Sequence, residues 1–342
     1  MSSKSPLLEL RGLEKHFEQR RSFKEIALRK DKPPVQAVDG VSFELNENES
    51  KAIIGESGCG KSTLLKTLMG LHDYTGGRLF YKGRDTGGFV DSDWKEFRRN
   101  VQMIFQDPFN SLDPKKTVRS TLKQPLNVHK MDNKTDRIHD VLQEVELNPP
   151  EKYLDRFPGQ LSGGERQRVS IARALVLDPD VILADEPVSM LDVSTQAAIL
   201  KKLKNLIETK DISMLYISHD VSTVSYVADI IKVMYLGRIV ESAPTETLLS
   251  EPKHPYSQAL VSSIPVPDPT HEREHPKVKG SPRDPIGIGE GCRFRDRCPE
   301  EMDICSKTPQ YVEAEEDHEV ACHLCYDHES QTDSQSETEV EL

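Results

Sequence analysis

A glycine-rich loop near the start of the chain has the residue types that bind phosphate groups. The segment Gly55-Glu-Ser-Gly-Cys-Gly-Lys61-Ser62 matches the pattern G-x-x-x-x-G-K-[ST] and lies between a strand pattern and a helical pattern. Glycines let such a loop curl so that its N–H groups face the phosphates, while Lys61 reaches the β- and γ-phosphates and Ser62 coordinates Mg²⁺. A glycine-rich turn with an accidental Lys-Ser pair is the alternative. We predict that a nucleoside triphosphate is held by Gly55, Glu56, Ser57, Gly58, Cys59, Gly60, Lys61, Ser62 and Thr63.

Two consecutive carboxylates follow an apolar strand pattern in the segment VILADEP. Sheets of this type present ligand-binding residues at the carboxyl ends of their strands, so both side chains are placed to act on a bound nucleotide. We predict that Asp185 holds the Mg²⁺ shell, often through water, and that Glu186 orients and deprotonates the attacking water. An acid pair that only caps the next helix is the alternative explanation.

These residues need a sheet that brings loops from distant segments together. Apolar runs of strand length alternate with helical patterns up to about residue 240, which predicts an α/β fold. Several runs are apolar on both faces, as in the buried strands of a covered parallel sheet. The predicted strands are 41–45, 51–55, 101–105, 181–185 and 213–218, and an inserted helical subdomain is expected at about 115–175.

The octapeptide Leu161-Ser-Gly-Gly-Glu-Arg-Gln-Arg168 resembles the signature sequence of ABC-transporter ATPases. Its Ser162-Gly163-Gly164 opens a helical pattern, which predicts a second helix N-terminus that favours anions. The resemblance implies a P-loop NTPase of the ABC type that forms a dimer. In such a dimer Ser162, Gly163 and Gly164 contact the nucleotide held by the partner. A cap that serves only its own helix is the alternative.

Other segments match the family in the expected order. By resemblance, Phe17 stacks on adenine, Gln106 senses Mg²⁺ and the transporter interface, and His219 contacts the γ-phosphate. Ser189-Met-Leu-Asp192 matches the D-loop, with Met190 where the family usually has Ala. An ordinary core phenylalanine, a surface amide and a structural histidine are the alternatives. Neither the signature nor the hydrolytic residues are degenerate, so we expect an active ATPase.

The chain beyond the predicted ATPase core indicates which branch of the family it resembles. The segments HPYSQALVSSIP and GCRFRDRCPEEMDIC…VACHL are similar to the C-terminal extension of oligopeptide and dipeptide importer ATPases. This resemblance implies a second, related ATPase subunit, preferably in a heterodimer, and two membrane permeases fed by an extracytoplasmic binding protein. The segment 18–34 also resembles the second ATPase subunit of such systems. Other cargoes, such as nickel chelates or oligosaccharides, stay open because the ATPase does not touch the cargo.

Five of the six cysteines lie after a proline-rich segment, and they predict a metal centre. Cys292, Cys298, Cys305 and Cys322 are spaced C-x₅-C-x₆-C-x₁₆-C in a segment with few large apolar residues, so this segment needs an added constraint to fold. Zinc, an iron–sulfur cluster and unmetallated thiols are the alternatives. Resemblance to importer subunits that carry a [4Fe–4S] cluster favours iron and sulfur, with Cys325 as a substitute for Cys322.

Composition and charge exclude some classes of protein. The formal net charge is −12, but the chain from Thr308 onward holds 11 acidic residues and no Lys or Arg, so the body is nearly neutral. This balance does not predict nucleic-acid binding and disfavours a soluble ABC ATPase that acts on DNA or ribosomes. No apolar run approaches the ~18 residues of a membrane span and no signal peptide is recognisable, so we expect a cytoplasmic chain. The resemblance to importer ATPases implies that it is peripheral and bound at the cytoplasmic face of the membrane through the permeases.

These patterns divide the chain into four regions. The expected regions are an ABC ATPase domain at 7–250, a helical segment with a proline-rich linker at 251–285, a cysteine module at 286–325 and a disordered acidic tail at 326–342.

Overall fold

The computed structural model describes residues 5–19, 32–107, 111–264, 278–281 and 283–326. Most of the segment expected as an insertion at 18–34, most of the proline-rich linker and the acidic tail from residue 327 lie outside the described residues. No helix in the described part of the chain is both long and apolar enough to cross a membrane.

The central sheet has eight strands in the order β11-β12-β10-β9-β3-β8-β7-β6. Neighbouring strands are parallel from β9 to β6, and the remaining pairs are antiparallel. The central strands β3, β7 and β8 are buried along their whole length, which explains why their sequences are apolar on both faces. The parallel strands are β3 (Ser50–Ile54), β6 (Val101–Ile104), β7 (Val181–Asp185), β8 (Ser213–Ser218) and β9 (Ile230–Tyr235). The antiparallel strand β10 (Arg238–Pro244) comes next along the chain.

A second sheet has four antiparallel strands in the order β2-β1-β4-β5, and the strand predicted at 41–45 forms the end of its strand β2. Its sequence fits this sheet, because buried Val41, Phe43 and Leu45 alternate with exposed residues and such alternation suits a sheet with one covered face. This sheet comprises β1 (Leu8–Phe17), β2 (Val35–Leu45), β4 (Gly76–Tyr81) and β5 (Arg84–Asp85).

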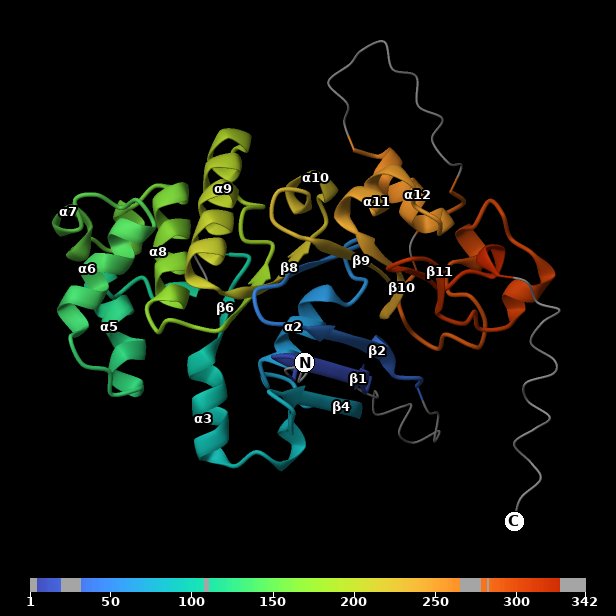
Figure 1. Ribbon diagram of the computed structural model, residues 1–342, viewed down its shortest axis with the longest axis horizontal. Helices are drawn as coiled ribbons and strands as arrows, with labels where there is room; N and C mark the ends of the chain where they lie inside the picture. Colours follow the sequence, from blue (N-terminus) through green and yellow to red (C-terminus); the bar gives the residue numbers. More distant parts are fainter. Residues whose placement is uncertain (1–4, 20–31, 108–110, 265–277, 282, 327–342) are drawn as a thin grey trace, which may run out of the picture.

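The helical subdomain predicted at about 115–175 forms a compact group of helices at one end of the molecule (Figure 1). Its members are α5 (Val118–Val128), α6 (Lys134–Glu144), α7 (Glu151–Leu154) and α8 (Gly163–Leu175). Their apolar residues, among them Leu122, Val141 and Leu142, join the same hydrophobic core as β6 and β7. The other helices are α2 (Lys61–Leu68), α3 (Asp91–Asn100), α9 (Val193–Lys210), α10 (Val221–Val224), α11 (Thr245–Ser250) and α12 (Pro255–Ser262).

The C-terminal region lies at the opposite end of the molecule from α5–α8 (Figure 1). It contains short 3₁₀ turns and two strands, β11 (Val312–Glu315) and β12 (His318–Val320). β12 pairs with β10, so this region extends the central sheet. Phe294 and Cys298 also join the hydrophobic core of the main domain, so the cysteine region is fixed to the ATPase core by both backbone pairing and packing.

Candidate functional site

The phosphate-binding loop joins β3 to α2 in a narrow space between two backbone segments. Gly60, the residue before α2, has a φ of 112°, and a Cβ atom there would lie 1.9 Å from the carbonyl oxygen of Ala37. A Cβ atom on Gly55 would lie 2.2 Å from the carbonyl oxygen of Met234. Side chains cannot fit at these distances, so glycine is required at both ends of the loop.

Lys61 and Ser62 begin α2 at the end of this loop. Lys61 is 5% exposed, and its Nζ donates hydrogen bonds to the carbonyl oxygens of Gly55, at 2.6 Å, and Glu56, at 3.0 Å. Ser62 Oγ donates to Asp185 Oδ1 at 2.9 Å. Burial raises the pKa of Asp185. A serine hydroxyl beside a buried carboxylate is an oxygen donor set that fits Mg²⁺, as predicted for these two residues.

Two predicted residues converge on one carboxylate oxygen of a third, Glu186. Gln106 Nε2 donates to Glu186 Oε2 at 2.9 Å, and His219 Nδ1 lies 2.9 Å from the same oxygen. Glu186 follows β7 and His219 follows β8, a neighbouring parallel strand, while Gln106 follows β6 on the other side of β7. The Glu186 side chain is 12% exposed, whereas that of His219 is 56% exposed. The carboxylate is thus held by partners while its surroundings stay open to a ligand.

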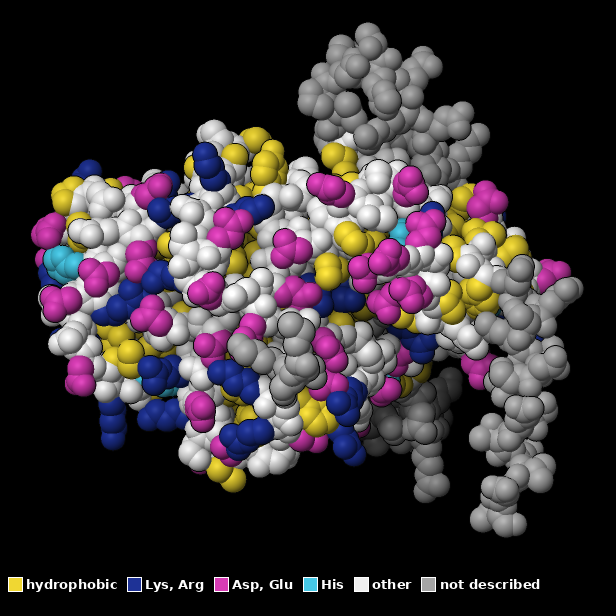
Figure 2. Space-filling model, viewed as in Figure 1, with side chains coloured by type: hydrophobic (Ala, Val, Ile, Leu, Met, Phe, Trp, Pro, Cys, Tyr) yellow, Lys and Arg dark blue, Asp and Glu magenta, His cyan; other side chains and the backbone are white. Residues whose placement is uncertain are grey.

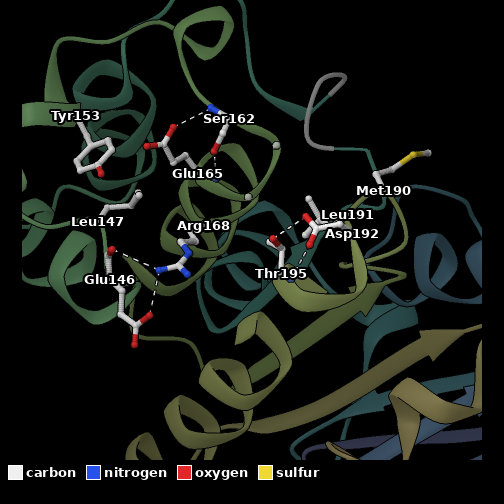
Figure 3. Close-up of a pocket in the computed structure, with 12 residues that line it drawn as sticks. Glu146, Leu147, Tyr153, Ser162, Glu165, Arg168, Met190, Leu191, Asp192 and Thr195 are labelled. Carbon is white, nitrogen blue, oxygen red and sulfur yellow. Dashed lines mark hydrogen bonds and ion pairs between the residues drawn. The ribbon is translucent and has the colours of Figure 1, made fainter. Parts of the chain in front are cut away.

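The predicted signature residues lie apart from this group. Ser162 caps α8, since its Oγ accepts the N–H of Glu165 and the Glu165 carboxylate accepts the N–H of Ser162. A hollow of about 450 Å³ opens beside this helix end (Figure 3). Its lining includes the signature residues and the D-loop, namely Ser162, Gly163, Gly164, Met190, Leu191 and Asp192. No residue of the phosphate-binding loop lines this hollow, so one chain presents two separate phosphate-binding elements.

Two apolar side chains near this hollow, those of Met190 and Val193, are exposed to solvent. Met190 is 60% exposed and Val193 is 80% exposed. Such exposed apolar residues at a site rimmed by polar groups are typical of a surface that another chain covers.

Phe17 lies at the end of β1, where it contacts the edge of the His72 ring at a centroid distance of 5.4 Å. The Nζ of Lys15 lies 4.9 Å from the centre of the Phe17 ring. The side chain is only partly buried, as an adenine-stacking residue must be. No contact joins Phe17 to the residues around Glu186 among those that the structure describes.

The five C-terminal cysteines are free thiols in one region. Cys298, Cys305 and Cys322 are buried, and the N–H of Cys292 donates to the carbonyl oxygen of Cys305 at 2.9 Å. Burial, with the neighbouring sulfurs of Cys305 and Cys298, raises the pKa of Cys292 to about 11. A hydrogen bond with Cys325 raises the pKa of Cys322, so these two sulfurs are also adjacent.

The sulfurs do not converge at the spacing of a zinc site. Within the described ranges, the one set of three or more Cys, His or acidic ligand atoms that all lie within 4.8 Å of one another is Glu14, His16 and Asp39. Tetrahedral zinc would hold its sulfurs about 3.8 Å apart. The set of Glu14, His16 and Asp39 does not suit a cation either, because Asp39 already pairs with Arg238 and Arg293. Burial raises the pKa of Asp39, but these arginines more than offset it, so the pKa is lowered.

The sequence analysis missed contacts between the C-terminal region and the phosphate-binding loop. Tyr256 Oη accepts the N–H of Glu56 at 2.8 Å, and Arg297 forms two hydrogen bonds with the Glu56 carboxylate. The segment HPYSQAL, noted only for its resemblance, carried the signal for Tyr256. No local pattern pairs Arg297 with a residue 241 positions away.

Acidic and basic side chains are intermixed over the face in Figure 2, in keeping with the nearly neutral body expected from the sequence.

Comparisons with known proteins agree with this geometry. The family model described as "ABC transporter" matches residues 38–189, and the model described as "Oligopeptide/dipeptide transporter, C-terminal region" matches residues 240–305. The putative oligopeptide transport ATP-binding protein YkfD of Bacillus subtilis is 44% identical over 93% of this chain and 95% of its own length. The oligopeptide transport ATP-binding protein AppF of the same organism is 42% identical over 94% of this chain and 98% of its own length.

Solved structures support the fold. A bacterial ABC transporter cassette solved as a dimer matches with a TM-score of 0.60 and 27% identity, over 70% of this chain and 98% of the cassette. The structure of cbiO1 from Clostridium perfringens, part of the ABC transporter complex cbiONQ, matches with a TM-score of 0.60 over 72% of this chain and 92% of its own, and at 23% identity it supports the fold alone. With its P-loop, its hydrolytic group and its signature helix, this chain belongs to the ATP-hydrolysing subunits of ABC transporters, in the branch that carries the oligopeptide/dipeptide transporter C-terminal region.

Proposed function

We propose that this chain powers the import of dipeptides or oligopeptides through partner membrane permeases. The observation that carries the proposal is the convergence of Gln106 and His219 on Glu186, next to the Ser62–Asp185 pair, in a chain with this C-terminal region. The peptide cargo is supported by the relatives that are named as oligopeptide transport ATP-binding proteins.

Hydrolysis follows from the residues around the phosphate-binding loop. Loop N–H groups and the N-terminus of α2 bind the phosphates, and Lys61 exchanges its bonds to loop carbonyls for phosphate oxygens. Ser62 and Asp185 would hold Mg²⁺, which would neutralise charge on the phosphates. Glu186 accepts a proton from the water that attacks the γ-phosphorus, and ADP leaves. Gln106 and His219 orient this carboxylate, and His219 is exposed enough to reach the γ-phosphate.

A complete site requires two chains. The hollow beside Ser162, Gly163 and Gly164 is separate from the phosphate-binding loop of the same chain, so each signature helix contacts the nucleotide of the partner. ATP binding then closes the dimer and hydrolysis reopens it. We propose a second, related ATPase as partner, two permeases that hold the pair at the cytoplasmic face, and an extracytoplasmic binding protein that delivers the solute. In this arrangement Phe17 stacks on adenine.

The cysteine region is proposed to hold a [4Fe–4S] cluster through Cys292, Cys298, Cys305 and either Cys322 or Cys325. Buried thiols gathered in one small region suit the thiolate ligands of an inorganic cluster, and the resemblance to importer subunits that carry such a cluster supports this choice. The role proposed for the cluster is structural, because it would cross-link a region with few apolar residues.

Purification of the native complex from membranes tests the import function. We expect the chain to co-purify with two permeases, and a binding protein of the same system to carry a bound peptide that mass spectrometry identifies. A bound nickel chelate or oligosaccharide would contradict the peptide cargo. Recovery with ribosomes or DNA, and without permeases, would contradict transport altogether.

A further inference from the structure

One 3₁₀ turn of the cysteine region contacts the phosphate-binding loop through a single arginine. Arg297 Nη1 donates to Glu56 Oε2 at 2.7 Å, and Arg297 Nη2 donates to Glu56 Oε1 at 2.9 Å. This two-pronged contact is the strong form of an arginine–carboxylate pair. The Arg297 side chain is 11% exposed and the Glu56 side chain 29% exposed, so the pair is partly shielded from solvent.

Aromatic rings hold this arginine in place. The guanidinium carbon lies 5.8 Å from the centre of the Tyr235 ring and 5.7 Å from that of Phe294. Tyr235, Tyr256 and Phe294 contact one another with centroid distances of 4.6–5.4 Å, so strand β9, helix α12 and the cysteine region meet in one cluster. A rigid cluster of this kind fixes the position from which Arg297 reaches the loop.

The backbone at Glu56 is held by the same cluster. Tyr256 Oη accepts the N–H of Glu56 at 2.8 Å. The start of α12 is fixed in turn, because His254 Nδ1 accepts the N–H of Tyr256 at 3.0 Å. Burial lowers the pKa of His254 to about 3, so the ring is neutral and Nδ1 is free to accept this bond near neutral pH. Glu56 is therefore held at both its backbone and its carboxylate.

The negative charge of Glu56 is unfavourable in a loop that binds phosphate groups. Its carboxylate is part of the segment that receives a triphosphate, and like charges at close range repel each other. We propose that Arg297 is a positioning residue for ATP binding, which neutralises the Glu56 carboxylate and keeps it turned away from the phosphates. The inference rests on the proposed function in one respect, namely that this loop holds the nucleotide.

The test measures the affinity of the full chain for MgATP and MgADP by titration calorimetry. Arg297→Gln removes the charge together with the guanidinium group that lies against the rings, and we expect a Kd about tenfold higher. Arg297→Lys keeps the charge and should stay within about threefold of the parent protein. Arg295→Gln is the matched control, because this arginine lies on the same turn and pairs with exposed Asp296; it should leave the Kd unchanged.

A second substitution distinguishes the effect of the Arg297 charge on ATP binding from the effect of Arg297 packing. Adding Glu56→Gln to Arg297→Gln removes the uncompensated carboxylate, so affinity should recover to within about threefold of the parent protein. A merely structural role for Arg297 would give no recovery, because the double variant also lacks the contact. Circular dichroism and the apparent Tm confirm that each variant is folded; if Arg297→Gln fails to fold, Arg297→Met and Glu56→Gln/Arg297→Met replace it and its double variant.

The outcomes are distinguishable from failure of the proposed function. Lys61→Ala should weaken nucleotide binding in any case, and normal binding by that variant would overturn the assignment of the loop itself. Where Lys61→Ala weakens binding but Arg297→Gln binds as the parent protein does, the Arg297 proposal alone is wrong. It is equally wrong if Arg297→Gln weakens binding and the double variant is no better.

Discussion

At the scale of the residue, Glu186 is the side chain that we propose as the general base of hydrolysis. Its carboxylate oxygen accepts from Gln106 and lies 2.9 Å from His219 Nδ1, so its position is fixed before the nucleotide binds. Glu186→Gln retains an oxygen that can accept these bonds, but an amide cannot take a proton from water. We expect hydrolysis in the assembled complex to fall by ~10²–10⁴ while ATP still binds and traps a closed dimer.

Single-turnover hydrolysis and nucleotide titration on the same sample check this expectation. Glu208→Gln, at an exposed position on α9, serves as the matched control and should hydrolyse ATP normally. Lys61→Ala should show the opposite defect, namely weak capture of the nucleotide. Near-normal hydrolysis by the Glu186→Gln variant would exclude this residue as the general base.

At the scale of the element, the C-terminal region has short strands and 3₁₀ turns but little apolar core of its own. We expect protein purified without oxygen to contain about four iron and four acid-labile sulfide atoms per chain. Cys298→Ser should lose the metal and lower the Tm, whereas Cys59→Ser, at a cysteine in the phosphate-binding loop, should retain it. Comparing Cys322→Ser with Cys325→Ser identifies the fourth ligand. Colourless protein with stoichiometric zinc, or with no metal, would contradict the proposed iron–sulfur cluster.

At the scale of the whole molecule, the phosphate-binding loop and the signature helix of one chain lie apart, and we propose that they contact different nucleotides. We expect the isolated chain to hydrolyse ATP poorly, because Ser162 and Gly164 must be supplied by a partner and the permeases align the two halves. The measurement compares the rate per site for the lone chain with that for the reconstituted transporter. Equal rates in a sample shown to be monomeric would contradict a site shared between two chains.

Local sequence determined much of the fold and most of the candidate site. The phosphate-binding loop, the signature helix and the buried strands were predicted because each is encoded by residue types at fixed short spacing: glycines at a tight turn, a capping serine followed by Glu165, and apolar runs of strand length. The strand predicted at 41–45 also forms, and its alternation of buried and exposed residues is typical of a sheet with one covered face.

Only the tertiary structure decided which of these pieces meet. The sequence indicates glycine at Gly60, but the obstacle to a side chain there is the carbonyl oxygen of Ala37 on another strand. The grouping of Gln106 and His219 around Glu186 depends on the order of strands in the sheet, and the pairing of Arg297 with Glu56 spans 241 positions. Motifs record local backbone conformation and chemistry, whereas contacts between distant segments arise from packing the whole core, and no short pattern encodes that packing.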